Sequence, residues 1–118
     1  MNELIFIGWD KCSTCKKAEK FLKDHQIPYS KRDIMTNNPT EAELTQWIKE
    51  SGIPIKRFFN TSGFVYRDMN LKEKLPNMSD AEQIKLLAST GRLIRRPLLL
   101  GDHGVFVGYH EEMYETLV

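Results

Sequence analysis

The chain has 118 residues, of which 41% are hydrophobic and 28% charged, and its formal net charge is +1, so we expect one domain, residues 1–118, with a single core. The balanced charge gives no general attraction to nucleic acid or to an anionic membrane, and no apolar run approaches the roughly 20 residues that span a bilayer. Met1-Asn2-Glu3 lacks the basic segment of a secretory signal, which predicts a cytoplasmic protein. We also expect a monomer that needs no cofactor.

A strand and a helix are predicted to meet at the first cysteine. Leu4-Ile5-Phe6-Ile7-Gly8 is an apolar run typical of a buried strand. Residues at helical spacing follow it, namely Ala18, Phe21, Leu22 and His25. Cys12 is therefore expected where the strand ends and the helix begins, with Cys15 on the first helical turn. Unpaired backbone N–H groups and partial positive charge at this point favour a thiolate. Three lysines nearby act in the same direction, Lys11, Lys16 and Lys17.

The spacing of the cysteines places Cys12 and Cys15 close enough to form a disulfide. A C-x-x-C pair at a strand-to-helix junction is typical of a redox site, in which one thiolate attacks and the other resolves the mixed disulfide. We expect Cys12 to be the nucleophile and Cys15 the resolving cysteine. The alternatives are a zinc site, a purely structural disulfide and two buried inert thiols. Zinc needs further ligands, and the three histidines have no finger-like spacing: His25, His103 and His110.

A second strand is predicted over residues 29–34, after Pro28 interrupts the first helix. A strand, a helix and a strand within about 30 residues indicate a βαβ unit with parallel pairing. Thr40 and Glu43 then have the spacing of a capping box, and the helix that they begin is expected to end at Gly52.

The middle of the chain is predicted to be mostly helical. Residues 66–75 are expected to form one short helix, ended by Pro76. Ser79 or Asp80 caps a clearer helix that ends at Gly91. Its inward-facing stripe is expected to consist of Ala81, Ile84, Leu87 and Ala88. Residues of about 38–92 are therefore interpreted as a helical insertion between two halves of a sheet.

Two strands and a short helix are predicted to close the chain. The apolar runs 97–100 and 105–107 flank Gly101-Asp102-His103-Gly104, which is typical of a hairpin turn. The last helix is expected over residues 110–117.

Arg95-Arg96-Pro97 is the second stretch that suggests a function. A bond before proline has an appreciable chance of being cis, which would hold the backbone in an exposed bend. Guanidinium groups bind oxyanions through paired donors and lower the pKa of a nearby thiol. The alternative is that both arginines are ordinary solvated surface charges.

Taken together, these stretches resemble the arsenate reductase (glutaredoxin-coupled type)/Spx family. The cysteine junction, the Arg95-Arg96-Pro97 segment and Val107-Gly108-Tyr109 occur in the family's order, and the likeness covers nearly the whole chain. The segments from Phe58 to Gly63 and from Asn70 to Leu75 resemble a little-characterised reductase-like branch with a C-x-x-C motif. The resemblance implies an α/β, thioredoxin-like fold, with a mixed four-stranded sheet, a helical insertion between its βαβ and ββα halves, and a structural cis proline at Pro97 facing the cysteine loop.

Two functions follow from the resemblance. Arsenate reductases of this type use one cysteine, matched by Cys12, and three oxyanion-binding arginines, two of which match Arg57 and Arg96. The third belongs after the last strand, where this chain has no arginine, and the reductases generally lack a cysteine at the place of Cys15. We expect a reductase of arsenate or of another oxidant, with Lys11 as a further oxyanion- or substrate-binding residue, that takes electrons from glutathione, glutaredoxin or thioredoxin. The alternative is an Spx-like redox-switched transcriptional regulator that binds the RNA polymerase alpha subunit, because Spx proteins also carry the C-x-x-C and Arg-Arg-Pro segments.

Overall fold

The computed structural model describes residues 3–118, which form two compact units. The first combines the residues up to Ile34 with Arg96–Val118, and the second is Met35–Arg95. The predicted insertion of about 38–92 lies within the second unit, and the interpretation of residues 1–118 as a single domain stays a prediction. Met1 and Asn2, on which the expected lack of a secretory signal partly rests, lie outside the described residues. Among the helices of the described chain, none is long and apolar enough to cross a membrane.

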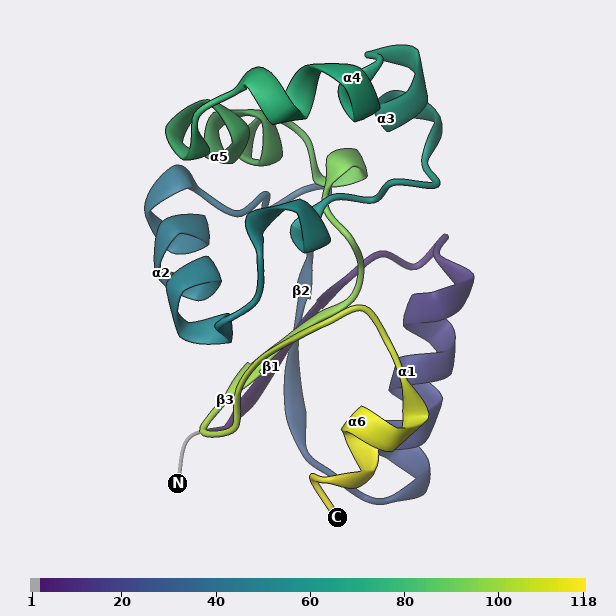
Figure 1. Ribbon diagram of the computed structural model, residues 1–118. Coiled ribbons are helices and arrows are strands. Elements are labelled where there is room, and N and C mark those ends of the chain that lie inside the picture. Colours follow the sequence, from purple (N-terminus) through teal and green to yellow (C-terminus); the bar gives the residue numbers. More distant parts are fainter. Residues whose placement is uncertain (1–2) are drawn as a thin grey trace. The chain divides into compact units, whose positions relative to one another are not determined.

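The first unit is built on one mixed sheet of four strands (Figure 1). The strands are β1 (Leu4–Gly8), β2 (Tyr29–Asp33), β3 (Leu98–Gly101) and β4 (Gly104–Val107), in the spatial order β2-β1-β3-β4. β1 pairs with β2 in parallel, while β1 with β3 and β3 with β4 pair antiparallel. The predicted parallel βαβ unit and the predicted C-terminal hairpin are therefore both confirmed.

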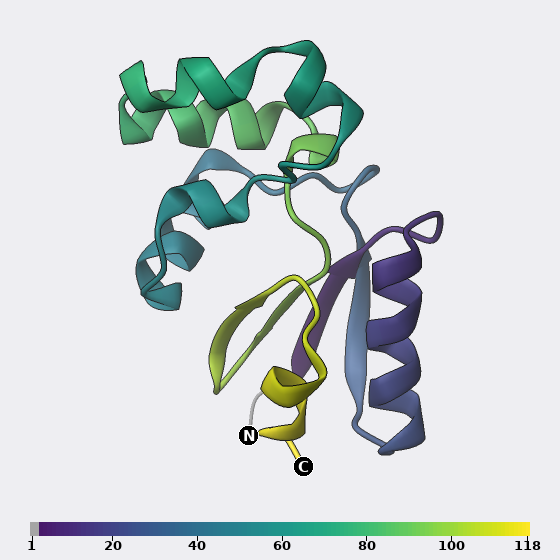
Figure 2. The same cartoon turned by 45° about the vertical axis from the view of Figure 1, so that its right-hand side comes forward.

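Two helices cover one face of this sheet. α1 (Ser13–Asp24) runs alongside the strands and contacts α6 (Glu111–Glu115) (Figure 2). Phe6 and Leu99 are register partners in β1 and β3, so their side chains lie on the same face. They join a buried cluster with residues of both helices: Cys15, Ala18, Phe21, Leu22 and Tyr114. The second cysteine is thus part of the hydrophobic core of this unit.

The second unit is helical, as expected. Its elements are α2 (Glu41–Ser51), η1 (Ile55–Phe58), α3 (Phe64–Asp68), α4 (Leu71–Lys74), η2 (Leu75–Asn77), α5 (Asp80–Ser89) and η3 (Gly91–Leu93). The predicted capping box of Thr40 and Glu43 is confirmed, and Gly52 ends α2 in the left-handed conformation with φ 69°. The cap of α5 is Ser79, which forms a second capping box with Glu82.

Two details of the second unit differ from prediction. The single helix expected over residues 66–75 is wrong, because α3 and α4 are separated at Asn70, which has φ 54° and begins a new helix. Asparagine tolerates this left-handed conformation better than most residues. In α5, Ala81 is exposed instead of facing inward, and the buried position belongs to Gln83.

Candidate active site

Cys12 lies between β1 and α1, where it caps the helix. Its backbone is extended, with φ −97° and ψ 118°, and its N–H donates to the carbonyl oxygen of Trp9 at 3.0 Å. Its Sγ accepts the backbone N–H of Cys15 at 3.3 Å. Helix caps are usually oxygen acceptors, which satisfy N–H groups that have no partner within the helix. Here a sulfur fills that position, and an ionised sulfur is the better acceptor.

The surroundings of Cys12 favour the thiolate. Burial of this half-buried side chain acts to raise its pKa, but hydrogen bonds from the Cys15 side chain and backbone and the hydrogen bond and charge of Arg96 outweigh burial. The net result is a pKa below the usual range of a cysteine. The predicted direction of the shift is thus supported, although Arg96 and not the neighbouring lysines supplies the charge.

Cys15 has the opposite character. Only 1% of its surface is exposed, and both cysteines are free thiols in the structure. Burial, followed by the hydrogen bond to Cys12 and the negative charge of Cys12, raises the pKa of Cys15 to about 12. The two sulfurs are therefore distinguished by their surroundings: one is accessible and acidic, and the other is buried and protonated.

Gly8 lies where β1 passes the buried sulfur, and it leaves no room for a side chain. A Cβ on Gly8 would lie 2.7 Å from Cε1 of Phe6 and 3.2 Å from Sγ of Cys15. Both distances are shorter than ordinary van der Waals contact. The absence of a side chain at Gly8 therefore allows β1 and the start of α1 to pack closely.

We predict that Gly8→Ala lowers the free energy of unfolding by about 1 to 3 kcal/mol, because the added methyl group overpacks the core. Chemical denaturation of the reduced protein measures this change. Repeating it in a Phe6→Leu background tests the cause, since removing the ring removes the shorter of the two contacts and is expected to reduce the effect of Gly8→Ala. An unchanged free energy of unfolding in Gly8→Ala would show that this part of the core has spare volume.

Arg96 and Trp9 form the cationic and aromatic side of the site. Cζ of Arg96 lies 5.5 Å from the centroid of the Trp9 ring, and Nζ of Lys11 lies 5.9 Å from it. These are distances at which a cation is attracted to an indole. The peptide bond between Arg96 and Pro97 is cis. The indole in the loop that carries Cys12 thus lies within reach of two cations, Lys11 from the same loop and Arg96 from the segment before β3.

A network of charges links this loop to the rest of the first unit. Nζ of Lys31, in β2, lies 2.7 Å from Oδ1 of Asp10 and 2.9 Å from Oε1 of Glu19. The hydroxyl of Tyr29 donates to Oε2 of Glu19 at 2.6 Å. Asp10 is two residues before Cys12, so Lys31 joins β2 to both the cysteine loop and α1. The hydrogen bond and charge of Lys31 hold the pKa of Asp10 below its usual value.

We predict that Lys31→Met lowers the free energy of unfolding by more than Lys20→Met, which breaks the simpler pair of Lys20 and Asp24 within α1. The decrease is modest, because exposed ion pairs are weak. The pKa values of Asp10 and Glu19 are lowered in the folded protein, so their contribution is present above the unfolded values of about 4 and is lost as the pH falls through that range. Denaturation at pH 7 and pH 3 should therefore show a difference between wild type and Lys31→Met at pH 7 that shrinks at pH 3. An equal difference at both values would contradict the ionic explanation.

The structure brings four of the predicted site residues into the first unit: Cys12, Cys15, Arg96 and Pro97. Lys11 belongs to the same unit and is exposed beside Trp9. Arg57 is exposed in η1 of the second unit, and its part in an oxyanion site stays a prediction. Among residues 3–118, no group of three or more histidine, cysteine or acidic side chains is placed to hold a metal ion.

Sequence analysis missed the roles of Trp9 and Lys31. The signal for Trp9 was an aromatic residue inside a cationic loop. No comparable signal marks Lys31, whose neighbours follow from the register that pairs it with Phe6 across β1 and β2.

Comparison with known proteins places this site in a family. A profile of the ArsC family matches residues 8–117. The chain is 46% identical over 112 residues to the uncharacterized protein YusI of Bacillus subtilis, and the match covers 95% of each chain. A solved structure from Bacteroides fragilis, described as related to the ArsC family, has a TM-score of 0.95 and 46% identity, covering 99% of this chain and 98% of its own. The global transcriptional regulator Spx of Staphylococcus epidermidis is more distant, with 28% identity over 101 residues, 86% of this chain and 76% of Spx.

The mixed sheet, together with a cysteine pair at the start of its first helix, defines a thioredoxin-like α/β protein. Within that class, the chain belongs to the ArsC family. The predicted resemblance and fold class are therefore confirmed. The higher identity to YusI than to Spx also agrees with the expected likeness to a little-characterised branch.

Proposed function

We propose that the protein is a thiol–disulfide redox protein in which Cys12 is the nucleophile and Cys15 the resolving cysteine. The observation that carries this proposal is the unequal pair: the pKa of Cys12 is lowered beside Arg96, whereas Cys15 is buried and its pKa is raised to about 12. A thiolate is the attacking form of cysteine. A pair of this kind fits the predicted cytoplasmic location, where thiols are kept reduced and cysteine pairs act in cycles.

In the first step, the Cys12 thiolate attacks an oxidised substrate. With a disulfide, the new bond joins Sγ of Cys12 to one substrate sulfur, and the other sulfur leaves as a thiolate. With a peroxide, one oxygen is transferred to Sγ, giving a sulfenic acid, and the remainder leaves as an alcohol or water. With arsenate, an arsenic–sulfur bond replaces an arsenic–oxygen bond. In each case the negative charge on Cys12 is lost.

That loss of charge prepares the second step. The hydrogen bond to Cys12 and the negative charge of Cys12 are two of the causes that raise the pKa of Cys15. Both weaken once Cys12 is modified, so the Cys15 thiol becomes a stronger acid when it is needed. Cys15 then gives up its proton and attacks Sγ of Cys12, which forms the disulfide and releases a thiolate, water or arsenite. The two electrons that reduce the substrate come from the two sulfurs.

Arg96 is proposed to orient an anionic substrate as well as to stabilise the thiolate. Its planar guanidinium offers paired donors, which suit an oxyanion or a carboxylate. Lys11, exposed in the loop that carries Cys12, would add positive charge beside the thiolate. Arg57 is a weaker candidate for the same role. Glutathione, glutaredoxin or thioredoxin would restore the thiols.

A second candidate function is an Spx-like redox switch that binds the RNA polymerase alpha subunit. It is favoured by the likeness to Spx and by the C-x-x-C pair, together with the lack of an arginine in Val107-Gly108-Tyr109. In this case the same disulfide would form, but it would alter partner binding instead of turning over a substrate.

Single-turnover oxidation tests the proposal. Reduced protein is mixed separately with arsenate, glutathione disulfide and peroxide, and intact mass is followed over time. We expect a Cys12–Cys15 disulfide with at least one oxidant, and no disulfide in Cys12→Ser. If none of the three oxidises Cys12 faster than an exposed thiol in an unfolded control, the redox proposal fails.

A pull-down with the RNA polymerase alpha subunit separates the two candidates. Capture that differs between the reduced and oxidised protein would support the switch. No capture, together with repeated turnover in the presence of a thiol reductant, would support the enzyme.

A further inference from the structure

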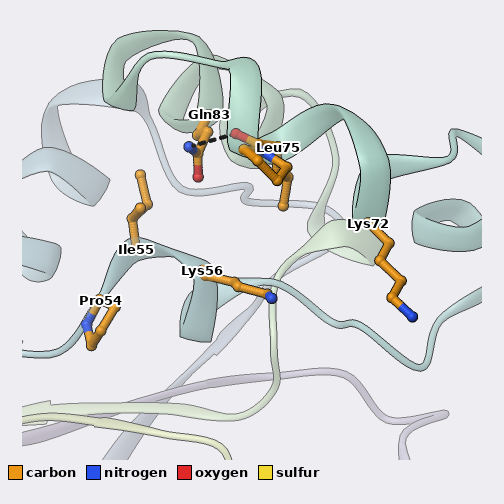
Figure 3. A pocket seen from close by; sticks show the side chains of 7 residues that line it. Pro54, Ile55, Lys56, Lys72, Leu75 and Gln83 are labelled. Carbon is orange, nitrogen blue, oxygen red and sulfur yellow. Dashed lines mark hydrogen bonds between the residues drawn. The ribbon is translucent and has the colours of Figure 1, made fainter.

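The second unit contains a cavity of about 200 Å³ that thiol chemistry does not explain (Figure 3). Its apolar walls include Pro54, Ile55 and Leu75. Lys56 and Lys72 carry ammonium groups at its border, and Gln83 of α5 contributes a polar group. Three parts of the unit therefore meet here: η1 with the residue before it, the α4–η2 segment and α5.

Gln83 is the informative residue, because it is polar and only 8% exposed. Its Nε2 donates to the carbonyl oxygens of Met78 at 3.1 Å and Leu75 at 3.4 Å. Backbone carbonyls only accept hydrogen bonds, so the nitrogen of the carboxamide must face them and Oε1 must face the other way. In Figure 3 this oxygen points into the space between Ile55 and Leu75. Within residues 3–118, no donor reaches it.

Oε1 of Gln83 is not among the buried polar atoms that lack a hydrogen bond, so it reaches solvent in the free protein. A ligand that fills the cavity displaces water from this oxygen, and it must supply a donor, because a buried acceptor left without a donor is unfavourable. The size of the cavity limits the ligand. A dry cavity of about 150 Å³ is large enough for benzene, so this one accommodates one aromatic side chain but not a drug-sized molecule, which needs roughly 300 Å³ or more. Tyrosine and tryptophan are the largely apolar aromatic side chains that carry their own donor, whereas histidine is more polar and adds positive charge when protonated beside the two lysines. These residues are also enriched among those that dominate protein interfaces.

The charged side chains at the border of the cavity indicate which residues of a partner would flank its aromatic ring. Lys56 and Lys72 are exposed, and neither forms an ion pair or side-chain hydrogen bond with the residues that the structure describes. Two unpaired cations beside an apolar cavity complement a segment that carries carboxylates next to its aromatic residue.

We propose that this cavity is a docking site for a protein partner that presents an acidic segment with a tyrosine or tryptophan anchor. The ring packs against Pro54, Ile55 and Leu75, its hydroxyl or indole N–H donates to Oε1 of Gln83, and flanking aspartates or glutamates face Lys56 and Lys72. Recognition at this site uses no cysteine, so it is independent of the redox chemistry proposed above.

The test uses the reduced full-length chain and a capped peptide, Glu-Glu-Tyr-Glu-Glu, followed by amide chemical shifts and titration calorimetry. We expect weak, saturable binding that shifts the amides of Ile55, Leu75 and Gln83. Replacing the tyrosine of the peptide by phenylalanine should weaken binding about fivefold to tenfold, because one hydrogen bond is lost. The double variant Lys56→Glu/Lys72→Glu should weaken it by at least about tenfold, and Lys85→Glu, on an exposed lysine of α5 that does not line the cavity, should change it little.

Gln83→Met keeps the length of the side chain and removes the acceptor, so the preference for tyrosine over phenylalanine should disappear. If this variant does not fold, the peptide pair and the exposed lysine variants still decide the question. Equal binding of both peptides to wild type, or equal losses in Lys85→Glu and the double variant, would overturn the proposal. If capped tyrosine alone binds as tightly as the acidic peptide, the proposal of a protein partner is overturned and the cavity binds a small aromatic ligand instead.

Discussion

Treatment of the reduced protein with one equivalent of peroxide is expected to remove two hydrogens from its mass, and the product is expected to be the Cys12–Cys15 disulfide. Cys15 is the nearest thiol to a modified Cys12, because its backbone N–H already lies 3.3 Å from Sγ of Cys12. Its effective concentration at that point should exceed millimolar glutathione. The disulfide should therefore form even when glutathione is present, and it should protect Cys12 from irreversible oxidation.

The matched variant is Cys15→Ser. It cannot close the disulfide, so it should accumulate the glutathione adduct when glutathione is present and oxygen additions when it is absent. A reductant should return wild type to its starting mass, whereas sulfinic acid formed in the variant stays. If wild type with glutathione gives mainly the adduct, Cys15 is not the resolving residue, and the family's single-cysteine pattern applies instead.

The location of Cys12 could be predicted from sequence because two strong periodicities meet there. The apolar run of β1 ends at Gly8, and the helical spacing that includes Ala18 and Phe21 begins soon after, so the pair could only lie at a helix start. The burial of the Cys15 side chain was harder to predict from the sequence. Three lysines around the pair indicated exposure, but Cys15 faces the sheet while Lys16 and Lys17 face solvent. Neighbours along a helix point in different directions, so local charge does not report burial.

The contacts missed from sequence depend on tertiary structure. Lys31 meets Asp10 only because the parallel register of β1 and β2 brings residue 31 beside the cysteine loop. The inward stripe of α5 was misjudged for a related reason. Gln83 is not part of the predicted stripe, but in the structure it is buried, and its carboxamide donates to the carbonyl oxygens of Leu75 and Met78 in the segment before α5. Polarity argues for exposure only when the fold provides no partner.

The second large expected effect concerns the pH at which Cys12 becomes reactive. Cys15 is 1% exposed, so alkylation by iodoacetamide in the folded protein should report on Cys12 alone, and its rate should rise with the thiolate fraction as the pH increases. Burial acts to raise the pKa of Cys12, but the hydrogen bonds from Cys15 and the interaction with Arg96 outweigh it. The inflection for wild type should therefore lie below the value of about 8.5 for a free cysteine. In Arg96→Ala it should move upward, because both the hydrogen bond and the positive charge are lost.

Because Arg96→Ala removes a charge-assisted hydrogen bond to the thiolate, its alkylation at pH 7 should be slower by up to about tenfold and should approach the wild-type rate at high pH. Arg96→Lys keeps the charge without the planar fork and should fall between the two. Arg95→Ala is the matched control, because the adjacent arginine is not among the groups that shift the pKa of Cys12, and its inflection should equal that of wild type. A wild-type inflection at or above 8.5, or equal shifts in Arg95→Ala and Arg96→Ala, would remove the specific role of Arg96 and with it the case for Cys12 as an activated nucleophile.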